Sequence, residues 1–174
     1  MASTNDRLGS YRRMYTIGDG SCFFHAVSAA VNLSNYNACS TSKKTVVAHK
    51  LRACVCDQYS KFLQDLSVDL RESVDKSGRR IFDTVADAAN TTRYAGEALW
   101  RLTATLLKVN ILVHQSPTTT YVSPDRRGDL YPTTIVIAHV NGNHFEPFMS
   151  RNRGGIHATD SILIQKLLPF RDGV

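Results

Sequence analysis

The sequence lacks any hydrophobic run long enough to cross a bilayer, and its first dozen residues are polar rather than arranged as a signal peptide. Cysteine is scarce: the four cysteines stand at positions 22, 39, 54 and 56, and none belongs to a CxxC pair. Two of them fall within one apparent helix, so a disulfide framework is not expected. We therefore expect a reduced, intracellular protein that acts in the cytoplasm.

The sequence also lacks the motifs of metal and nucleotide sites. His49, Cys54 and Cys56 do not have the spacing of a zinc finger or ribbon, and we expect them to be packing residues on one helix. Gly18-Asp19-Gly20 is not followed by the Lys-Ser/Thr pair that ends a phosphate-binding loop. We therefore predict no cofactor and no bound metal.

Basic residues are not gathered in one stripe, although the chain carries a net charge of +6. They occur as separated pairs, and no aromatic platform typical of RNA recognition accompanies them. We predict that they are solvated loop charges, so neither nucleic acid nor a membrane is an expected partner. The pairs are Lys43-Lys44, Arg79-Arg80, Arg126-Arg127 and Arg151 with Arg153.

The chain does contain enough apolar residues for a core. Its 174 residues are 43% hydrophobic, which suits one domain. We place this domain at residues 14–170, behind a polar tail at residues 1–13 that we expect to be flexible. We expect the domain to be a monomer.

Helical patterns dominate the first two thirds of the chain. Residues 22–31 have no internal Gly or Pro and predict a helix, and Thr41 or Ser42 is expected to cap a longer one. The apolar positions of the longer helix are Val47, Leu51, Cys54, Val55, Phe62 and Leu66. Further helices are predicted over residues 83–90, about 93–108, and 161–168, the last capped by Asp160.

Strand patterns follow the helices. Residues 109–114 and 133–140 are apolar runs typical of buried strands, and Tyr121-Val122 predicts a weaker one. Asn141-Gly142-Asn143 then predicts a hairpin turn into a short strand at 144–148, which we expect Pro147 to curtail. This order of elements predicts an α/β (α+β) fold with a small central sheet packed between helices.

A cysteine at the start of the first helix is a candidate nucleophile. The unpaired N–H groups and the dipole of a helix start favour an anion, and the thiolate is the reactive form of cysteine. Cys22 therefore occupies a position that suits catalysis. An inert, buried Cys22 is an equally good interpretation of this segment taken alone.

The turn before Cys22 is a candidate oxyanion site. Gly18 and Gly20 permit positive φ and close approach of a substrate, and Asp19 is expected to organise the turn with its side chain. The N–H groups from Gly20 through Ser21 to Cys22 are then expected to be free to hold an oxyanion.

A histidine on the late hairpin is the candidate general base. His144 and Glu146 lie two apart on a predicted strand, so their side chains share one face. Glu146 can then orient the imidazole while its other nitrogen faces the thiol. Cys and His far apart in sequence but joined in the fold are what thiol catalysis requires.

Three blocks together make the chain resemble the ovarian-tumour (OTU) cysteine proteases, which remove ubiquitin from proteins. The first block is Asp19-Gly20-Ser21-Cys22 with aromatic residues and His25-Ala26 after it, and the last is Asn143-His144-Phe145-Glu146. The middle block extends from Tyr94-Ala95-Gly96-Glu97 to Ile111-Leu112-Val113. The blocks stand in the family's order across roughly residues 15–149.

The resemblance implies an OTU-like fold and a deubiquitinase with Cys22 as nucleophile and His144 as base. Asp19 matches the residue that shapes the oxyanion turn, with Gly20 and Ser21 beside it, and Gly142 and Asn143 are candidate walls of a channel for the ubiquitin tail. The implied partners are ubiquitin, ubiquitinated proteins or a ubiquitin-like modifier. A compact core of this kind suits a viral source, with host immune evasion as its role and the host cytoplasm as its location, or a bacterial effector.

The third member of the triad stays open. Glu146 stands where the family more often has Asp or Asn, so Asn141 or Asn143 is an alternative. Two other functions also remain: a ubiquitin-binding module with an inactive site, and a basic nucleic-acid-binding domain, which steep salt-dependent RNA binding would support.

Overall fold

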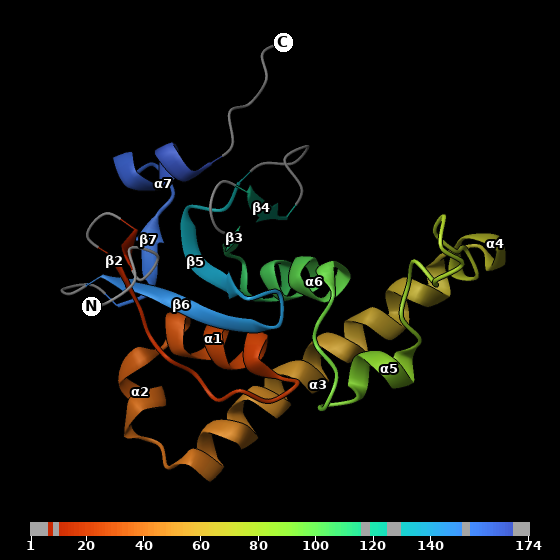
Figure 1. Cartoon of the computed structure of the whole chain (residues 1–174), viewed down its shortest axis with the longest axis horizontal. Helices are drawn as coiled ribbons and strands as arrows, with labels where there is room; N and C mark the ends of the chain where they lie inside the picture. The colour runs from red at the N-terminus through yellow and green to blue at the C-terminus, as the bar shows by residue number, and fades with distance from the viewer. Residues whose placement is uncertain (1–6, 9–10, 116–118, 125–129, 151–153, 169–174) are drawn as a thin grey trace.

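A computed structural model describes residues 7–8, 11–115, 119–124, 130–150 and 154–168. Within these residues, seven strands form one mixed sheet in the order β1-β2-β6-β5-β3-β4, with β7 paired to β5 (Figure 1). Strands β3 and β5 are parallel, and the other pairs are antiparallel. The strands are β1 (Arg7–Leu8), β2 (Tyr11–Arg13), β3 (Asn110–Gln115), β4 (Thr119–Ser123), β5 (Thr133–Val140), β6 (His144–Ser150) and β7 (Ile156–Ala158).

The helices cover both faces of this sheet, most of them on one face. They are α1 (Cys22–Val31), α2 (Leu33–Ala38), α3 (Thr41–Asp65), α4 (Val68–Arg71), α5 (Val85–Ala89), α6 (Glu97–Leu107) and α7 (Ile162–Leu167). The predicted mixed fold, with a sheet between helices, is therefore confirmed. No helix in the described part of the chain is both long enough and apolar enough to span a membrane.

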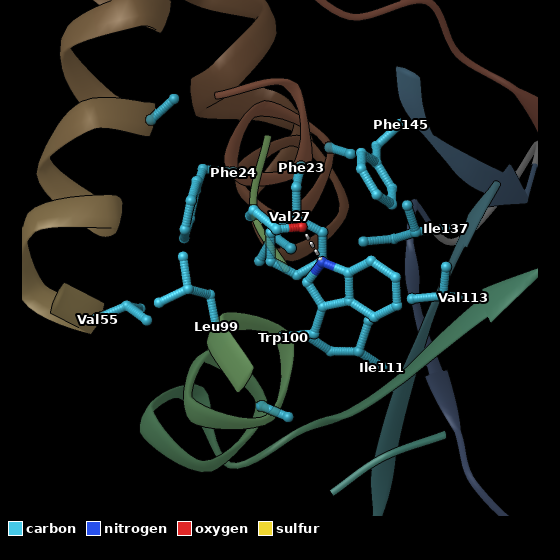
Figure 2. Packing of buried hydrophobic residues seen from close by; sticks show 14 of the residues in the cluster. Phe23, Phe24, Val27, Val55, Leu99, Trp100, Ile111, Val113, Ile137 and Phe145 are labelled. Atoms are coloured by element: carbon cyan, nitrogen blue, oxygen red, sulfur yellow. Dashed lines mark hydrogen bonds between the residues drawn. The ribbon is translucent and has the colours of Figure 1, made fainter. Parts of the chain in front are cut away.

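Side chains of the central strands point alternately to the two faces of the sheet, so the core consists of two layers. Ile135 and Ile137 of β5 point to a larger cluster with α1, α3, α5 and α6, as Figure 2 shows for part of it. Val136 and Ala138 point to a smaller cluster that includes Ile164 of α7. Side chains in a strand alternate between the two faces, so an apolar run such as 135–138 is buried on both.

Helix α1 is the innermost helix of the larger layer. Phe23 and Phe24 are fully buried, and Phe23 packs against Trp100 of α6 and Phe145 of β6. A run without Gly or Pro favours a helix here, and burial on nearly every side anchors its first turn. The observed bounds of α1 match the predicted 22–31.

The buried face of α3 matches the predicted one at Leu51, Val55, Phe62 and Leu66 and differs at other positions. Val47 and Cys54 are exposed, whereas Ala48, Arg52 and Tyr59 are buried. The hydrophobic pattern did not identify Arg52 because it treats arginine as a surface residue. The cap also differs, since Ser40, not Thr41 or Ser42, accepts the N–H of Lys43.

The end of β6 and the cap of α7 also differ from the prediction. Strand β6 continues to Ser150 through Pro147, whose carbonyl accepts the N–H of Met14. Proline lacks only the donor, so it did not curtail the strand as predicted. Ser161, not Asp160, caps α7 through the N–H of Ile164.

The expected tail contributes to the sheet. Tyr11–Arg13 forms β2, which pairs with β6, and Arg7–Leu8 forms β1. The domain therefore begins earlier than residue 14. Short strands of this kind depend on a distant partner, which local patterns do not reveal. Residues 1–6 and 9–10 of the expected tail lie outside the described residues, as do the pair Arg126-Arg127 and Arg151 with Arg153.

Candidate active site

The candidate nucleophile lies at the junction of α1 and the β5–β6 hairpin. Cys22 is 1% exposed, and its thiol donates to the carbonyl oxygen of Asn143 at 3.9 Å. Residues 121 positions apart in the chain thus meet at the sulfur. The structure therefore brings the predicted cysteine next to the residue that precedes His144.

The environment of Cys22 favours the neutral thiol in this structure. Burial raises the pKa of the Cys22 thiol, and the negative charge of Asp19 acts in the same direction. The backbone donors of Phe145 and Phe23 oppose this rise in pKa without overcoming it. The backbone donors favour the anion as expected for a helix start, but desolvation of the buried thiol has the larger effect on its pKa.

Asp19 ties together the turn that precedes Cys22. Its carboxylate oxygen Oδ1 accepts the N–H of Ser21 at 2.8 Å, and its main-chain oxygen accepts the N–H of Cys22 at 3.1 Å. The side chain thus organises the turn as expected for Asp. Two of the three N–H groups expected to be free, those of Ser21 and Cys22, are already engaged. In the described part of the chain, no hydrogen bond uses the N–H of Asp19 or Gly20.

Neither glycine serves positive φ, and only Gly20 is required for close approach. Neither Gly18 nor Gly20 lies in the left-handed region. A Cβ added to Gly20 would lie 2.2 Å from the carbonyl carbon of Thr92 and 2.5 Å from the nitrogen of Arg93. Backbone therefore packs against backbone here, and only glycine fits. A Cβ on Gly18 would meet the His144 ring at 3.8 Å, which is ordinary contact.

The candidate base contacts the candidate third member. His144 Nε2 lies 3.6 Å from Glu146 Oε1, and Glu146 Oε2 lies 3.4 Å from Arg13 Nε. The His144 ring also packs on Tyr15, with centroids 5.8 Å apart. The Nδ1–Cε1 edge of the ring borders Gly18, where an added Cβ would lie 3.8–3.9 Å from these two atoms. Glu146 thus faces one side of the imidazole while the nucleophile turn lies on the other.

The hairpin turn between β5 and β6 is exposed. Asn141 has φ 51° and Gly142 has φ 74°, as a tight hairpin requires. Among the described residues, neither Asn141 nor Asn143 directs a side-chain hydrogen bond at His144. Asn143 contributes its main-chain oxygen, which contacts Cys22.

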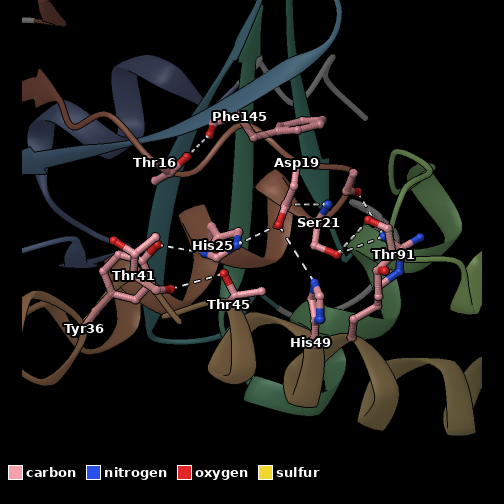
Figure 3. A network of polar contacts seen from close by, with 12 residues as sticks. Thr16, Asp19, Ser21, His25, Tyr36, Thr41, Thr45, His49, Thr91 and Phe145 are labelled. Carbon is pink, nitrogen blue, oxygen red and sulfur yellow. Dashed lines mark hydrogen bonds and ion pairs between the residues drawn. The ribbon is translucent and has the colours of Figure 1, made fainter. Parts of the chain in front are cut away.

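A cluster of polar side chains lies behind the nucleophile turn (Figure 3). His25 Nε2 lies 3.3 Å from Asp19 Oδ2, and His25 Nδ1 lies 2.9 Å from the Tyr36 hydroxyl. His49 Nε2 approaches the same Asp19 oxygen at 3.9 Å. Sequence reasoning gave Asp19 its role in the turn but assigned no function to His25 or Tyr36, although a histidine three positions after the cysteine was a visible signal.

Arg52 supports the same turn from α3. Its guanidinium is 1% exposed and donates to the carbonyl oxygens of Gly20, Ala88 and Arg93 at 2.8–2.9 Å. It also donates to the Ser21 hydroxyl at 3.2 Å. A planar group with several donors suits this role, and burial lowers the pKa of Arg52. No group of three or more His, Cys, Asp or Glu side chains in the described ranges is placed to hold a metal ion.

Comparison with known proteins assigns this arrangement to a family. The sequence model described as OTU-like cysteine protease matches residues 17–152. No curated protein sequence matched the chain.

Solved structures share the fold. An ovarian tumour (OTU) domain in complex with ubiquitin has a TM-score of 0.63 at 15% identity, covering 89% of this chain and 78% of that one. The OTUD1 OTU domain has a TM-score of 0.57 at 20% identity, covering 80% and 85%. An OTU deubiquitinase from Wolbachia pipientis wMel bound to ubiquitin has a TM-score of 0.54 at 22% identity, covering 83% and 99%. At these identities the likeness concerns the fold alone.

Proposed function

The chain belongs to the OTU-like cysteine protease family, and from this premise we propose that it is a deubiquitinating enzyme. It hydrolyses the bond after the carboxy-terminal glycine of ubiquitin or a ubiquitin-like modifier. The observation that carries this proposal is the placement of Cys22 against Asn143 beside His144. Similar OTU domains solved with bound ubiquitin support this substrate class. The proposed place of action is the cytoplasm.

The first half of the reaction forms a thioester. His144 takes the thiol proton of Cys22 through the nitrogen that faces away from Glu146. The sulfur then bonds to the carbonyl carbon of the terminal glycine. The bond from this carbon to the lysine nitrogen breaks while His144 returns the proton to that nitrogen, and the amine leaves.

The second half releases the modifier. Water adds to the thioester carbon and gives a proton to His144, and the carbon–sulfur bond breaks as the sulfur regains a proton. Because burial raises the pKa of Cys22, proton transfer to His144 accompanies the attack rather than preceding it. No cofactor takes part in these steps.

The N–H groups of the nucleophile turn hold the oxyanion. Those of Asp19 and Gly20 have no hydrogen-bond partner in the described part of the chain and are therefore the ready donors. The Cys22 N–H becomes a further donor if it exchanges its bond to the Asp19 carbonyl oxygen for the oxyanion. Donors placed before reaction stabilise developing charge without reorganisation.

Glu146 is the proposed third member of the triad. Its 3.6 Å separation from His144 Nε2 supports the role, and the described asparagine side chains of the turn make no such contact. Arg13 holds the other carboxylate oxygen and thereby limits rotation of Glu146. A third member mainly orients the histidine, so a longer contact in the free enzyme remains compatible with function.

Cleavage of a ubiquitin–lysine isopeptide conjugate tests the proposal. The intact chain should release free ubiquitin, and Cys22→Ala should abolish release while it retains the fold. Cys54→Ala is the matched control, because Cys54 is exposed on α3 and away from the turn. Release that survives Cys22→Ala rejects Cys22 as nucleophile, and ubiquitin binding without cleavage by the intact chain makes it a binding module.

A further inference from the structure

We propose that His25 is a positioning residue that holds Asp19, and through it the oxyanion turn, in the geometry that acyl transfer needs. The inference rests on the proposed function and adds a residue to its machinery. His25 does not contact substrate in this scheme. It acts through the carboxylate of Asp19, which lies at the beginning of the turn that carries Cys22.

The burial and the two polar contacts of His25 suit a positioning role. Its side chain is fully buried on α1, and both ring nitrogens face polar partners. One partner is the Tyr36 hydroxyl of α2, at 2.9 Å, and the other is Asp19 Oδ2, at 3.3 Å. A buried polar side chain costs free energy unless its hydrogen bonds are made, so both contacts constrain where Asp19 lies.

The hydrogen bonds between Tyr36, His25 and Asp19 allow only one assignment of donors and acceptors. A carboxylate only accepts, so Nε2 of His25 must carry the hydrogen. Burial lowers the pKa of His25, which keeps the ring neutral and makes Nδ1 an acceptor. Tyr36 must then donate its O–H to Nδ1, and burial raises the pKa of Tyr36 to about 12, so the hydroxyl keeps its proton. Tyr36 therefore fixes the tautomer that His25 needs to hold Asp19.

The order continues from Asp19 into the turn. One carboxylate oxygen receives His25 Nε2–H, and the other receives the Ser21 N–H. Rotation of the carboxylate away from His25 would therefore release the Ser21 N–H and disturb the backbone beside Cys22. Among the described residues, the other ion-pair contact of this oxygen is His49 Nε2, which lies 3.9 Å away on a partly exposed side chain. It cannot hold the carboxylate as firmly.

The test compares substitutions that keep or remove the Nε2 donor. Glutamine places an amide nitrogen at about the level of histidine Nε2, whereas asparagine reaches only the level of Nδ1. His25→Gln should retain isopeptide cleavage within about threefold of the intact chain. His25→Asn and His25→Leu should lower kcat by about 10- to 100-fold with little change in KM, since small misplacements of catalytic groups have effects of this size.

Alkylation of Cys22 by iodoacetamide separates positioning from damage to the cysteine. This displacement at carbon forms no oxyanion, so it depends on the thiol but not on the oxyanion turn. In His25→Asn, the alkylation rate of the Cys22 peptide, followed by mass spectrometry, should stay within about twofold of the intact chain while kcat falls. The matched control is His157→Asn, another buried histidine, which lies beside Tyr11 in the other layer. Its kcat should not change.

Tyr36→Phe gives an independent test because it removes only the donor to Nδ1. We expect a fall in kcat smaller than that of His25→Asn and little added effect when both substitutions are combined. Equal kcat for the intact chain, His25→Gln and His25→Asn overturns the inference, as does a parallel loss of kcat and alkylation. If the intact chain itself cleaves no conjugate, the proposed function has failed instead, and the two failures remain distinct.

Discussion

The two sides of the candidate active site are held in very different ways. The nucleophile turn is bound from the carboxylate side by His25 and from the carbonyl side by Arg52, both buried. On the base side only the hairpin turn is exposed; His144 and Glu146 follow it with side chains 19% and 13% exposed, and their nearest polar atoms are 3.6 Å apart. One half of the site is anchored by fully buried polar side chains, and the other half by a single, longer ion-pair contact beside an exposed turn.

This difference indicates which part of the site is held in its final geometry before substrate binds, namely the nucleophile turn. Buried polar groups cost free energy to desolvate, and Arg52 offsets part of that cost through four hydrogen bonds to the turn and its neighbours. Hydrogen bonds to charged groups contribute about 1.5–3 kcal/mol each, so the turn is held strongly. Catalytic contacts are often long in free enzymes and shorten on binding, which suits the base side.

The largest effect expected on the nucleophile side comes from Gly20→Ala. The added Cβ would overlap the backbone of Thr92 and Arg93, which cannot rotate away. Overpacking of this kind costs about 1–3 kcal/mol of unfolding free energy, and displacement of the turn should remove most activity. Chemical denaturation and conjugate cleavage measure both effects.

Gly18→Ala is the matched control for this substitution. Its Cβ would meet the His144 ring at 3.8 Å, an ordinary contact. It should fold with nearly unchanged stability. Equal stability losses for the two substitutions would contradict the view that only Gly20 is sterically required.

On the base side, Glu146→Ala is expected to have the next largest effect. It should lower kcat by about 10- to 100-fold, part of the roughly 10²–10⁴ that a positioned general base contributes. Arg13→Gln removes the other contact of the carboxylate and should lower kcat less. Unchanged kcat in Glu146→Ala would shift the third role to Asn141 or Asn143.

The pH dependence of Cys22 alkylation gives a further test of the nucleophile side. Because burial raises the pKa of the Cys22 thiol, its alkylation in the folded chain should increase over a higher pH range than in the denatured chain. The folded state also binds this proton more tightly. Its contribution to stability is therefore present below the unfolded thiol pKa and is lost as pH rises through the folded pKa. A lower midpoint for the folded chain would mean that Cys22 rests as a thiolate.

The smallest effect is expected at the tip of the hairpin. Gly142 has φ 74°, and a Cβ there would meet nothing within 4 Å. Gly142→Ala should therefore cost only the backbone strain, about 1–2 kcal/mol, with kcat changed by less than about twofold. Thermal unfolding and turnover test this, and a large fall in kcat would show that the turn is as exacting as the nucleophile side.

The sequence predicted those parts of the site that depend on local patterns. Helix α1, strand β5 and the hairpin turn follow from periodicity and turn residues, and all lie where expected. The face of α3 was predicted correctly at Leu51, Val55, Phe62 and Leu66, but Arg52 was missed because hydrophobic periodicity treats arginine as a surface residue. Its partners, the carbonyl oxygens of Gly20, Ala88 and Arg93, come from segments that only the fold brings together.

The parts of the fold that the sequence did not predict also depend on contacts between distant segments. Strand β2 has three residues and exists by pairing with β6, more than a hundred residues away. The rise in the pKa of the Cys22 thiol was not predicted either, because it comes from burial, which outweighs the backbone donors at the helix start. Burial beneath the hairpin is a property of the tertiary structure.

The most direct measurement is reaction with ubiquitin that carries an electrophile at its carboxy terminus, followed by mass spectrometry of the product. The intact chain should gain one ubiquitin, attached at Cys22, and Cys22→Ala should gain none. An adduct on another cysteine, or no adduct on a chain shown to be folded, would contradict the assignment of Cys22 as a nucleophile directed at the ubiquitin terminus.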